Sequence, residues 1–200
     1  MSADDGAPLT APAPRHVSGP YRVCLVCLGN ICRSPMAEVV LRGELDRADL
    51  AGLVAVDSAG TGDWHVGGPM DPRARAELSR HGYDGSGHRA RQFRPSWFGH
   101  YDLVLAMDQA NLERLRWAAP GADAERVRLF RSFDPALAGR SGDDLEVPDP
   151  YHGGPDDYAL VFDLVQPAVR GLVDQLRRVL DGRPAEPGAS GASGAHGSPD

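Results

Sequence analysis

Apolar and polar positions follow two different periods along the middle of the chain. Short, nearly unbroken apolar runs are typical of strands that are buried on both faces. Four such runs are YRVCLVC, LVAVDSAG, YDLVLAM and VRLF, at residues 21–27, 53–60, 101–107 and 127–130. Apolar residues that recur every three to four positions predict helices instead. These helical stretches cover residues 34–48, 71–82, 108–119 and 155–181.

Strand and helix therefore alternate, which predicts a three-layer α/β sandwich with a four-stranded parallel sheet flanked by helices. Residues suited to helix starts support these boundaries: Pro35 lies in the first turn of one helix, and Asp71 with Pro72 opens the next. In open parallel sheets the ligand site lies at the carboxyl ends of the strands. Because Cys27 ends the first predicted strand, we expect a site in the segment that follows it.

The two ends of the chain differ in composition from its middle. Residues 1–19 and 183–200 are rich in Ala, Pro and Gly and poor in large apolar side chains. Such segments cannot build a core, so we expect a disordered tail at each end. The remaining residues, 20–182, are predicted to form a single domain. The first 20 residues lack an apolar stretch and carry acids early, so a secretory signal is not expected.

Net charge and cysteine content narrow the classes of function. The formal net charge is −7, which argues against a broad attraction to nucleic acid or anionic lipid. No apolar run in the sequence approaches the roughly 20 residues of a membrane helix. The three cysteines, at 24, 27 and 32, form an odd and clustered set rather than a disulfide framework. We therefore expect a reducing, cytoplasmic location, with neither nucleic acid nor membrane as a partner.

The segment CLGNICRS, which begins at Cys27, combines a thiol, a tight turn and an arginine where a strand meets a helix. Gly29 and Asn30 tolerate positive φ, so that successive backbone N–H groups can converge on an anion. The following helix adds free amides and the positive end of its dipole. Arg33 can hold two phosphate oxygens with its planar fork. Together with the Ser34 hydroxyl these groups favour a thiolate, which predicts a phosphate-binding loop with a nucleophile at its base.

A cysteine, five further residues and an Arg-Ser pair also occur by chance in unrelated sequences. The plainer interpretation is that Cys27 and Cys32 are small residues at a strand end and a helix start, and that Arg33 is a solvated charge. The position of the motif, directly after an apolar strand and before a helix, favours the phosphate loop. Cys24 lies inside the strand and is expected to be an inert core residue.

The stretch VCLGNICRSPMAE resembles the phosphate loop of the low-molecular-weight protein tyrosine phosphatases. Further stretches resemble later motifs of that family, in the same order along the chain. They are SAGTGDWHVG, HRARQF, LVLAMDQAN and VPDPYHGG, at residues 58–67, 88–93, 103–111 and 147–154. The resemblance covers nearly all of residues 21–181, is closest to the actinobacterial branch, and leaves out both tails.

The resemblance implies a protein-tyrosine-phosphatase with a phosphocysteine intermediate, in which Cys27 is the nucleophile. Arg33 and the loop would bind the phosphate, and the loop residues concerned are Leu28, Gly29, Asn30, Ile31, Cys32 and Ser34. From the residues alone, Asp149 in its Pro-Asp-Pro-Tyr turn is simply a turn residue. The resemblance makes it the general acid that protonates the departing phenolate, and then the base for hydrolysis. No cofactor and no metal are expected, because Arg33 and the loop amides can stabilise the phosphoryl charge.

The same resemblance implies residues that shape the pocket. Trp64, His65 and Tyr151 are expected to form aromatic walls that favour phosphotyrosine over the shorter phosphoserine. Members of the family often have a second tyrosine where this chain has His152, a departure that leaves the chemistry unchanged.

A supporting network around the loop is also implied. Ser58 and His88 are expected to hold Asn30 in its strained backbone conformation through hydrogen bonds. Asp108 can either pair with Arg33 or cap the helix that follows it, and capping is the simpler interpretation. Cys32 lies five residues from Cys27, so we hypothesise that a reversible disulfide between them either protects the nucleophile from oxidation or inactivates it.

Three other activities are compatible with parts of the pattern. Arsenate reduction on this fold needs further cysteines downstream of the loop, and none follows Cys32. Protein phosphoarginine phosphatases typically have threonine where this chain has Ile31. A catalytically silent phosphopeptide-binding module would keep Arg33 but lose Cys27 or Asp149, and both are present. The expected partners are phosphotyrosine-containing proteins, with a cognate tyrosine kinase as a further candidate.

Overall fold

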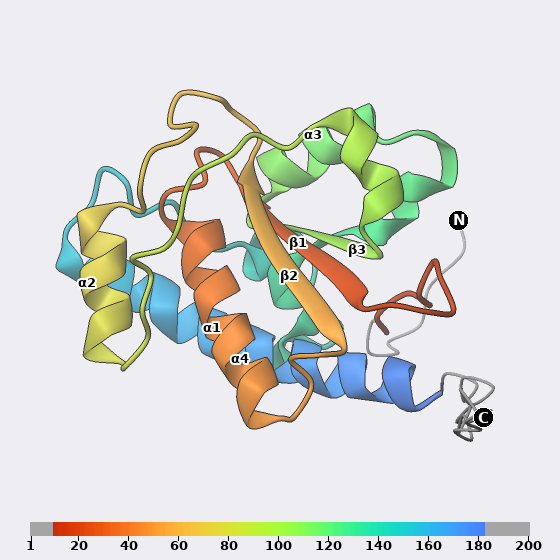
Figure 1. Cartoon of the computed structure of the whole chain (residues 1–200). Coiled ribbons are helices and arrows are strands. Elements are labelled where there is room, and N and C mark those ends of the chain that lie inside the picture. Colours follow the sequence, from red (N-terminus) through yellow and green to blue (C-terminus); the bar gives the residue numbers. More distant parts are fainter. Residues whose placement is uncertain (1–9, 183–200) are drawn as a thin grey trace, which may run out of the picture.

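The computed structural model describes residues 10–182 and contains a parallel sheet with helices on both faces (Figure 1). The four strands are ordered β2-β1-β3-β4. They are β1 (Tyr21–Cys27), β2 (Val54–Gly60), β3 (Leu103–Ala106) and β4 (Val127–Leu129). The predicted α/β fold is confirmed, and so are the four predicted strands, although β3 is shorter than expected.

The helices form the two outer layers of the molecule. The four α-helices are α1 (Arg33–Arg47), α2 (Pro72–Arg80), α3 (Gln109–Ala118) and α4 (Pro155–Asp181). Alternate residues of β1 face opposite layers. Val23 and Leu25 belong to the core shared with α1 and α4, whereas Cys24 and Val26 belong to the core shared with α3. Cys24 is fully buried, as predicted.

Several short 3-10 helices connect these elements and were not predicted. They are η1 (Pro95–His100), η2 (Gly121–Arg126), η3 (Phe130–Phe133), η4 (Pro135–Leu137) and η5 (Gly142–Leu145). Elements of three to six residues are too short to show a helical period in the sequence. They matter for the core nonetheless, because Phe98, Phe130 and Phe133 from these turns are buried.

Residues 10–19 belong to the stretch predicted as a disordered tail, but the structure differs: they follow a defined course at the amino ends of the strands. Ala11 is buried, and Arg15 makes the principal contacts. Its backbone N–H donates to Asp102 (2.6 Å), its Nε donates to the carbonyl oxygen of Tyr101 (2.8 Å), and its Nη2 pairs with Asp123 (2.5 Å). The acceptors lie far along the chain, so local composition could not indicate them. The predicted tails at residues 1–9 and 183–200 lie outside the described residues.

Arg15→Ala is expected to lower Tm by about 3–6 °C, because it removes a half-buried ion pair and a hydrogen bond to a backbone carbonyl. Thermal unfolding followed by circular dichroism measures the change. Arg114→Ala is the matched control, since Arg114 is exposed on α3, and it should leave Tm unchanged. Equal Tm values for the two variants would show that the side chain of Arg15 contributes nothing to stability.

None of the helices between residues 10 and 182 is long and apolar enough to cross a bilayer.

Candidate active site

The loop between β1 and α1 lies at the carboxyl end of the sheet, where it passes very close to the end of β2. A Cβ atom at Gly60 would lie 2.7 Å from the carbonyl oxygen of Leu28 and 3.1 Å from the backbone nitrogen of Asn30. Only glycine at position 60 leaves room for the loop. Gly29 is needed for space as well, since a Cβ there would lie 3.0 Å from the ring of His65. Its φ is not positive, contrary to the expectation for this position.

The sulfur of Cys27 lies at the base of the loop, where donors from the loop and from α1 converge. The backbone N–H of Asn30 donates to it over 3.2 Å, and the hydroxyl of Ser34 over 3.1 Å. The side chain of Cys27 is almost fully buried. The structure thus brings together the thiol, the turn and the helix start that the sequence predicted as one unit.

Asn30 is the one loop residue with a left-handed backbone conformation, at φ 55°. Its side-chain amide donates to the hydroxyls of Ser34 (2.9 Å) and Ser58 (2.8 Å), and its side-chain oxygen accepts from the backbone N–H of Arg91 (2.9 Å). Its carbonyl oxygen lies 2.7 Å from Nε2 of His88. Burial lowers the pKa of His88, the predicted partner. These contacts hold the strained residue in place, so the expected network of Asn30, Ser58 and His88 is present in the geometry.

Glu38 is part of this network, and sequence reasoning missed it. It is 8% exposed and accepts a hydrogen bond from the hydroxyl of Ser58. Arg42 pairs with its other oxygen at 2.7 Å, and Nδ1 of His88 lies 3.9 Å away. The available signal was an acid among the apolar residues Met36, Val40 and Leu41 of this helix, since acids are seldom buried without partners.

Arg33 is buried behind the loop, and its guanidinium contacts two carboxylates. Nη1 pairs with Asp108 and Nη2 with Asp149, both at 2.5 Å, and Nη1 also donates to the carbonyl oxygen of Val147 (3.2 Å). Burial alone would lower the pKa of Arg33, but Cys27 and the two carboxylates outweigh it and raise the pKa. Arg33 is therefore a permanent cation. Asp108 both pairs with Arg33 and caps α3, so the two interpretations of this residue hold together.

The predicted catalytic and wall residues meet at one cavity of about 420 Å³. Its lining comprises Cys27, Leu28, Gly29, Ile31, Cys32, Arg33, Trp64, His65, Asp149, Tyr151 and His152. The rings of His65 and Tyr151 are 6.2 Å apart, and Trp64 is 69% exposed at the rim. Asn30 and Ser34, predicted among the phosphate-binding residues, do not line this cavity; they donate hydrogen bonds to the sulfur of Cys27 instead.

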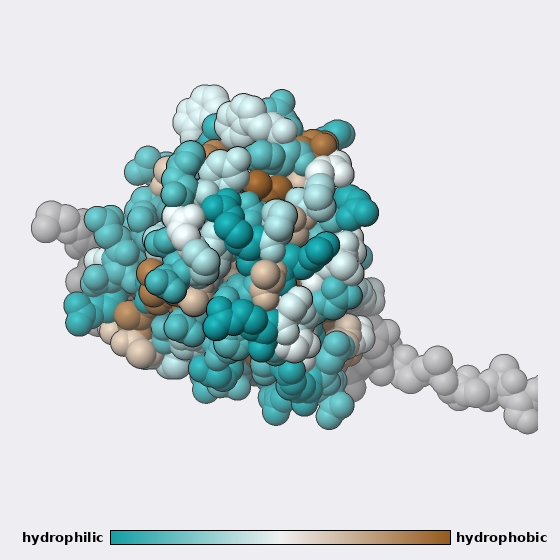
Figure 2. Space-filling view, turned by 90° about the vertical axis from the view of Figure 1, so that its left-hand side faces the viewer, coloured by the Kyte–Doolittle hydropathy of each residue, from teal (hydrophilic) through white to brown (hydrophobic). Residues whose placement is uncertain are grey.

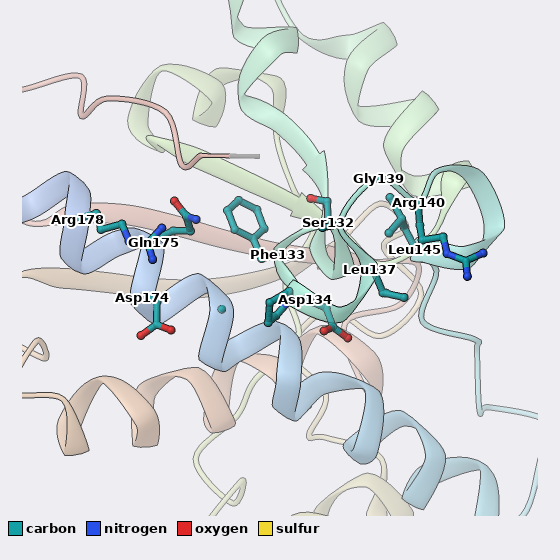
Figure 3. A pocket seen from close by; sticks show the side chains of 13 residues that line it. Ser132, Phe133, Asp134, Leu137, Gly139, Arg140, Leu145, Asp174, Gln175 and Arg178 are labelled. Atoms are coloured by element: carbon teal, nitrogen blue, oxygen red, sulfur yellow. The ribbon is translucent and has the colours of Figure 1, made fainter. Parts of the chain in front are cut away.

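A separate cavity of about 260 Å³ lies between α4 and the turns η3 to η5 (Figure 3). Its lining includes Asp134, Arg140, Asp174 and Arg178. It contains none of the predicted site residues.

All three cysteines are free thiols, and Cys32 lines the same cavity as Cys27. Its sulfur lies 3.6 Å from the hydroxyl of Tyr158, and burial raises its pKa to about 12. Cys32 is therefore a protonated thiol and a poor independent target for peroxide.

Cys32→Ser is expected to make oxidation of Cys27 irreversible. Peroxide would oxidise the sulfur of Cys27 to a sulfenic acid; the thiol of Cys32 then attacks that sulfur, and water leaves as the disulfide forms. Wild type should regain most of its activity in dithiothreitol after peroxide, and Cys32→Ser little of its own starting activity. Phosphate release before and after reduction measures this, and equal recovery in both proteins would rule out protection by Cys32.

Comparisons with known proteins agree with this geometry. A family model described as low molecular weight phosphotyrosine protein phosphatase matches residues 22–181. A low molecular weight protein-tyrosine-phosphatase of Streptomyces coelicolor is 53% identical over 82% of this chain and 99% of its own length. Low molecular weight protein-tyrosine phosphatase A of Mycobacterium tuberculosis is 45% identical over 79% and 93%.

Solved structures show the same fold. The crystal structure of a protein tyrosine phosphatase from Entamoeba histolytica matches with a TM-score of 0.73 and 32% identity, over 79% of this chain and 97% of that chain. The fold of the present chain, the loop around Cys27 and the family match over residues 22–181 lead to the same conclusion. The chain belongs to the low molecular weight phosphotyrosine protein phosphatases, a family of phosphoric monoester hydrolases.

Proposed function

We propose that this protein hydrolyses phosphotyrosine in proteins through a phosphocysteine intermediate formed on Cys27. The observation that carries the proposal is that the thiol, the guanidinium of Arg33 and the carboxyl group of Asp149 line one cavity with aromatic walls. Family membership supports the reaction class, and the three side chains supply its parts.

In the first step the thiolate of Cys27 attacks phosphorus, and the bond to the phenolic oxygen breaks. Asp149 gives its proton to that oxygen, so tyrosine leaves neutral. In the second step Asp149 takes a proton from water, whose oxygen attacks phosphorus, and the sulfur leaves as thiolate. Arg33 and the amides of the loop stabilise the charge on the phosphoryl oxygens in both steps.

The contact between Arg33 and Asp149 fits this cycle. Nη2 of Arg33 donates to Asp149 over 2.5 Å, so a phosphate oxygen that binds Arg33 competes with the carboxylate for the same donor. Because the side chain of Asp149 is 41% exposed, it can turn toward the mouth of the cavity, where the leaving oxygen of an aryl ester would lie. Substrate binding would therefore release Asp149 from Arg33, so that Asp149 can protonate the leaving oxygen.

Substrate choice follows from the cavity walls. Trp64, His65 and Tyr151 offer aromatic faces to the ring of phosphotyrosine, which a phosphoserine side chain is too short to reach. Ile31, buried in the loop, offers no hydroxyl that could orient water as in the phosphoarginine branch.

The proposal is tested by measuring phosphate release from three peptides of the same sequence. They carry phosphotyrosine, phosphoserine or phosphoarginine at one position. The phosphotyrosine peptide should be cleaved fastest, without added metal. Faster cleavage of the phosphoarginine peptide would leave the nucleophile in place but overturn the argument from Ile31. Binding of the phosphotyrosine peptide without cleavage would identify a binding module instead.

We also propose that the protein works in the cytoplasm, and that a cognate tyrosine kinase makes its substrates. The free thiols of Cys24, Cys27 and Cys32 support a reducing compartment. Cell fractionation with antibodies tests the location.

A further inference from the structure

We propose that Arg73 is a positioning residue for Asp149, because it fastens the far end of the loop at residues 147–154 to the phosphate-binding loop. This inference rests on the proposed role of Asp149 as proton donor. A proton donor must be held within hydrogen-bond reach of the leaving oxygen. The loop that carries Asp149 has no regular secondary structure before α4 begins at Pro155, so contacts from other segments must hold it.

The planar guanidinium of Arg73 donates hydrogen bonds to two backbone carbonyl groups that follow Asp149 in the chain. Nη2 donates to the carbonyl oxygen of Tyr151 over 3.0 Å, and Nη1 to that of Gly153 over 3.1 Å. The two acceptors are two residues apart, and a guanidinium can serve both because its N–H groups point in fixed, diverging directions.

Arg73 is itself held in place by Asp71. The carboxylate of Asp71 accepts from Nε (3.0 Å) and from Nη2 (2.9 Å) of Arg73. Asp71 is 8% exposed and also caps α2. Burial alone would raise the pKa of Asp71, but its hydrogen bonds with Arg73 outweigh that effect and lower it. The ring of Tyr158 supports the guanidinium from one side, 4.8 Å away.

This assembly is anchored in the phosphate-binding loop. The backbone N–H of Asp71 donates to the carbonyl oxygen of Ile31 over 2.9 Å. Tyr158, under the guanidinium, contacts the sulfur of Cys32. A continuous series of contacts therefore runs from the phosphate loop through Asp71 and Arg73 to the carbonyl groups behind Asp149.

The near end of the loop has its own anchors. The backbone N–H of Val147 donates to the carbonyl oxygen of Met107 at the end of β3 (2.7 Å), and Arg33 donates to the carbonyl of Val147 (3.2 Å). Asp149 thus lies in a loop whose start is held by contacts with Met107 and Arg33 and whose end is held by Arg73. Apart from those with Arg73, the hydrogen bonds at that end of the loop are local, such as the one from the N–H of Gly154 to Asp157 (2.7 Å).

The surroundings of Arg73 offer a matched control. Figure 2 looks onto the side that carries α2 and shows a mainly hydrophilic surface. Arg75 lies two residues further along the same helix and is exposed. It has the same side chain as Arg73, but its guanidinium does not contact the loop of Asp149.

The test compares two esters that differ in their need for a proton. Phosphotyrosine has a strongly basic leaving group, whereas p-nitrophenyl phosphate has a weakly basic one. Arg73→Ala and Arg73→Lys should each lower kcat/KM for phosphotyrosine by about tenfold. This loss is smaller than the roughly 10²–10⁴-fold rate enhancement that a general acid supplies, because Asp149 is still present. Both should lose less than about twofold on p-nitrophenyl phosphate, since that step needs little protonation.

Arg73→Lys distinguishes the loss of the two hydrogen bonds from a general loss of folding. Lysine keeps a cation beside Asp71, but its single ammonium group cannot reproduce the fork that serves two carbonyl groups. Tm is recorded for every variant. Arg75→Ala should match wild type on both esters.

Asp149→Ala in the same series separates the two proposals. If Asp149→Ala shows the selective loss and the Arg73 variants do not, or lose equally on both esters, the positioning role of Arg73 is wrong and the mechanism stands. If Asp149→Ala loses equally on both esters, Asp149 is not the proton donor, and the inference about Arg73 falls with it.

Discussion

Cys27→Ser is expected to abolish phosphate release from phosphotyrosine while leaving anion binding intact. A serine hydroxyl is far less acidic and less nucleophilic than a thiol, and within residues 10–182 only Asn30 and Ser34 hydrogen-bond to the sulfur, neither of them a base. The value of kcat should therefore fall at least about 10⁴-fold. Arg33 still lines the cavity and remains available to bind the anion. Phosphate release in a single turnover measures the loss, and calorimetric titration with inorganic phosphate measures the binding.

Cys24→Ala is the matched control for this substitution. Cys24 lies three residues earlier in β1 and faces the opposite side of the sheet, where it is fully buried. Its replacement by alanine should cost some stability, on the order of 1 kcal/mol, and leave the rate of turnover unchanged. Residual turnover in Cys27→Ser close to that of wild type would mean that another group is the nucleophile.

Asp149→Ala should lower kcat/KM on phosphotyrosine by about 10²–10³-fold, the second largest effect. The departing phenolate then lacks its proton donor, while Cys27 can still attack phosphorus. KM should not rise, because Asp149 competes with the phosphate for Arg33 and does not hold the phosphate. Steady-state kinetics on a phosphotyrosine peptide provide both constants.

Asp144→Ala tests whether the effect belongs to this one carboxylate. Asp144 lies on η5, where its side chain is 55% exposed and pairs with Arg140 at 3.4 Å. It should behave as wild type. A large loss in Asp144→Ala, or none in Asp149→Ala, would place the proton donor elsewhere.

The sequence predicted the frame of the protein because that frame depends on local periods. Each strand is a short apolar run, and helix starts carry local signals, such as Asp71 before Pro72, whose carboxylate does cap α2. The loop around Cys27 was predictable for the same reason. Its chemistry resides in consecutive residues, Cys27 to Ser34, and the turn between a strand and a helix brings them together.

Other parts of the site depend on contacts between distant segments, which no local pattern shows. Asn30 has its positive φ as expected, whereas Gly29 does not; there, space beside His65 is what glycine provides. Glu38 was missed because its partner Ser58 lies on another element. The segment around Arg15 looked unstructured in composition, yet its partners lie more than 80 residues away.

The sheet order β2-β1-β3-β4 has a consequence for how this site arose and how it can be altered. β1 has β2 on one side and β3 on the other, so it marks the topological switch point at which the connections run in opposite directions. A crevice at the end of β1 therefore follows from the strand order, before any loop residue is chosen. The strand order determines where the crevice lies, and the loop residues determine what binds there. Exchange of residues 28–34 alone is therefore a rational route to a different anion specificity.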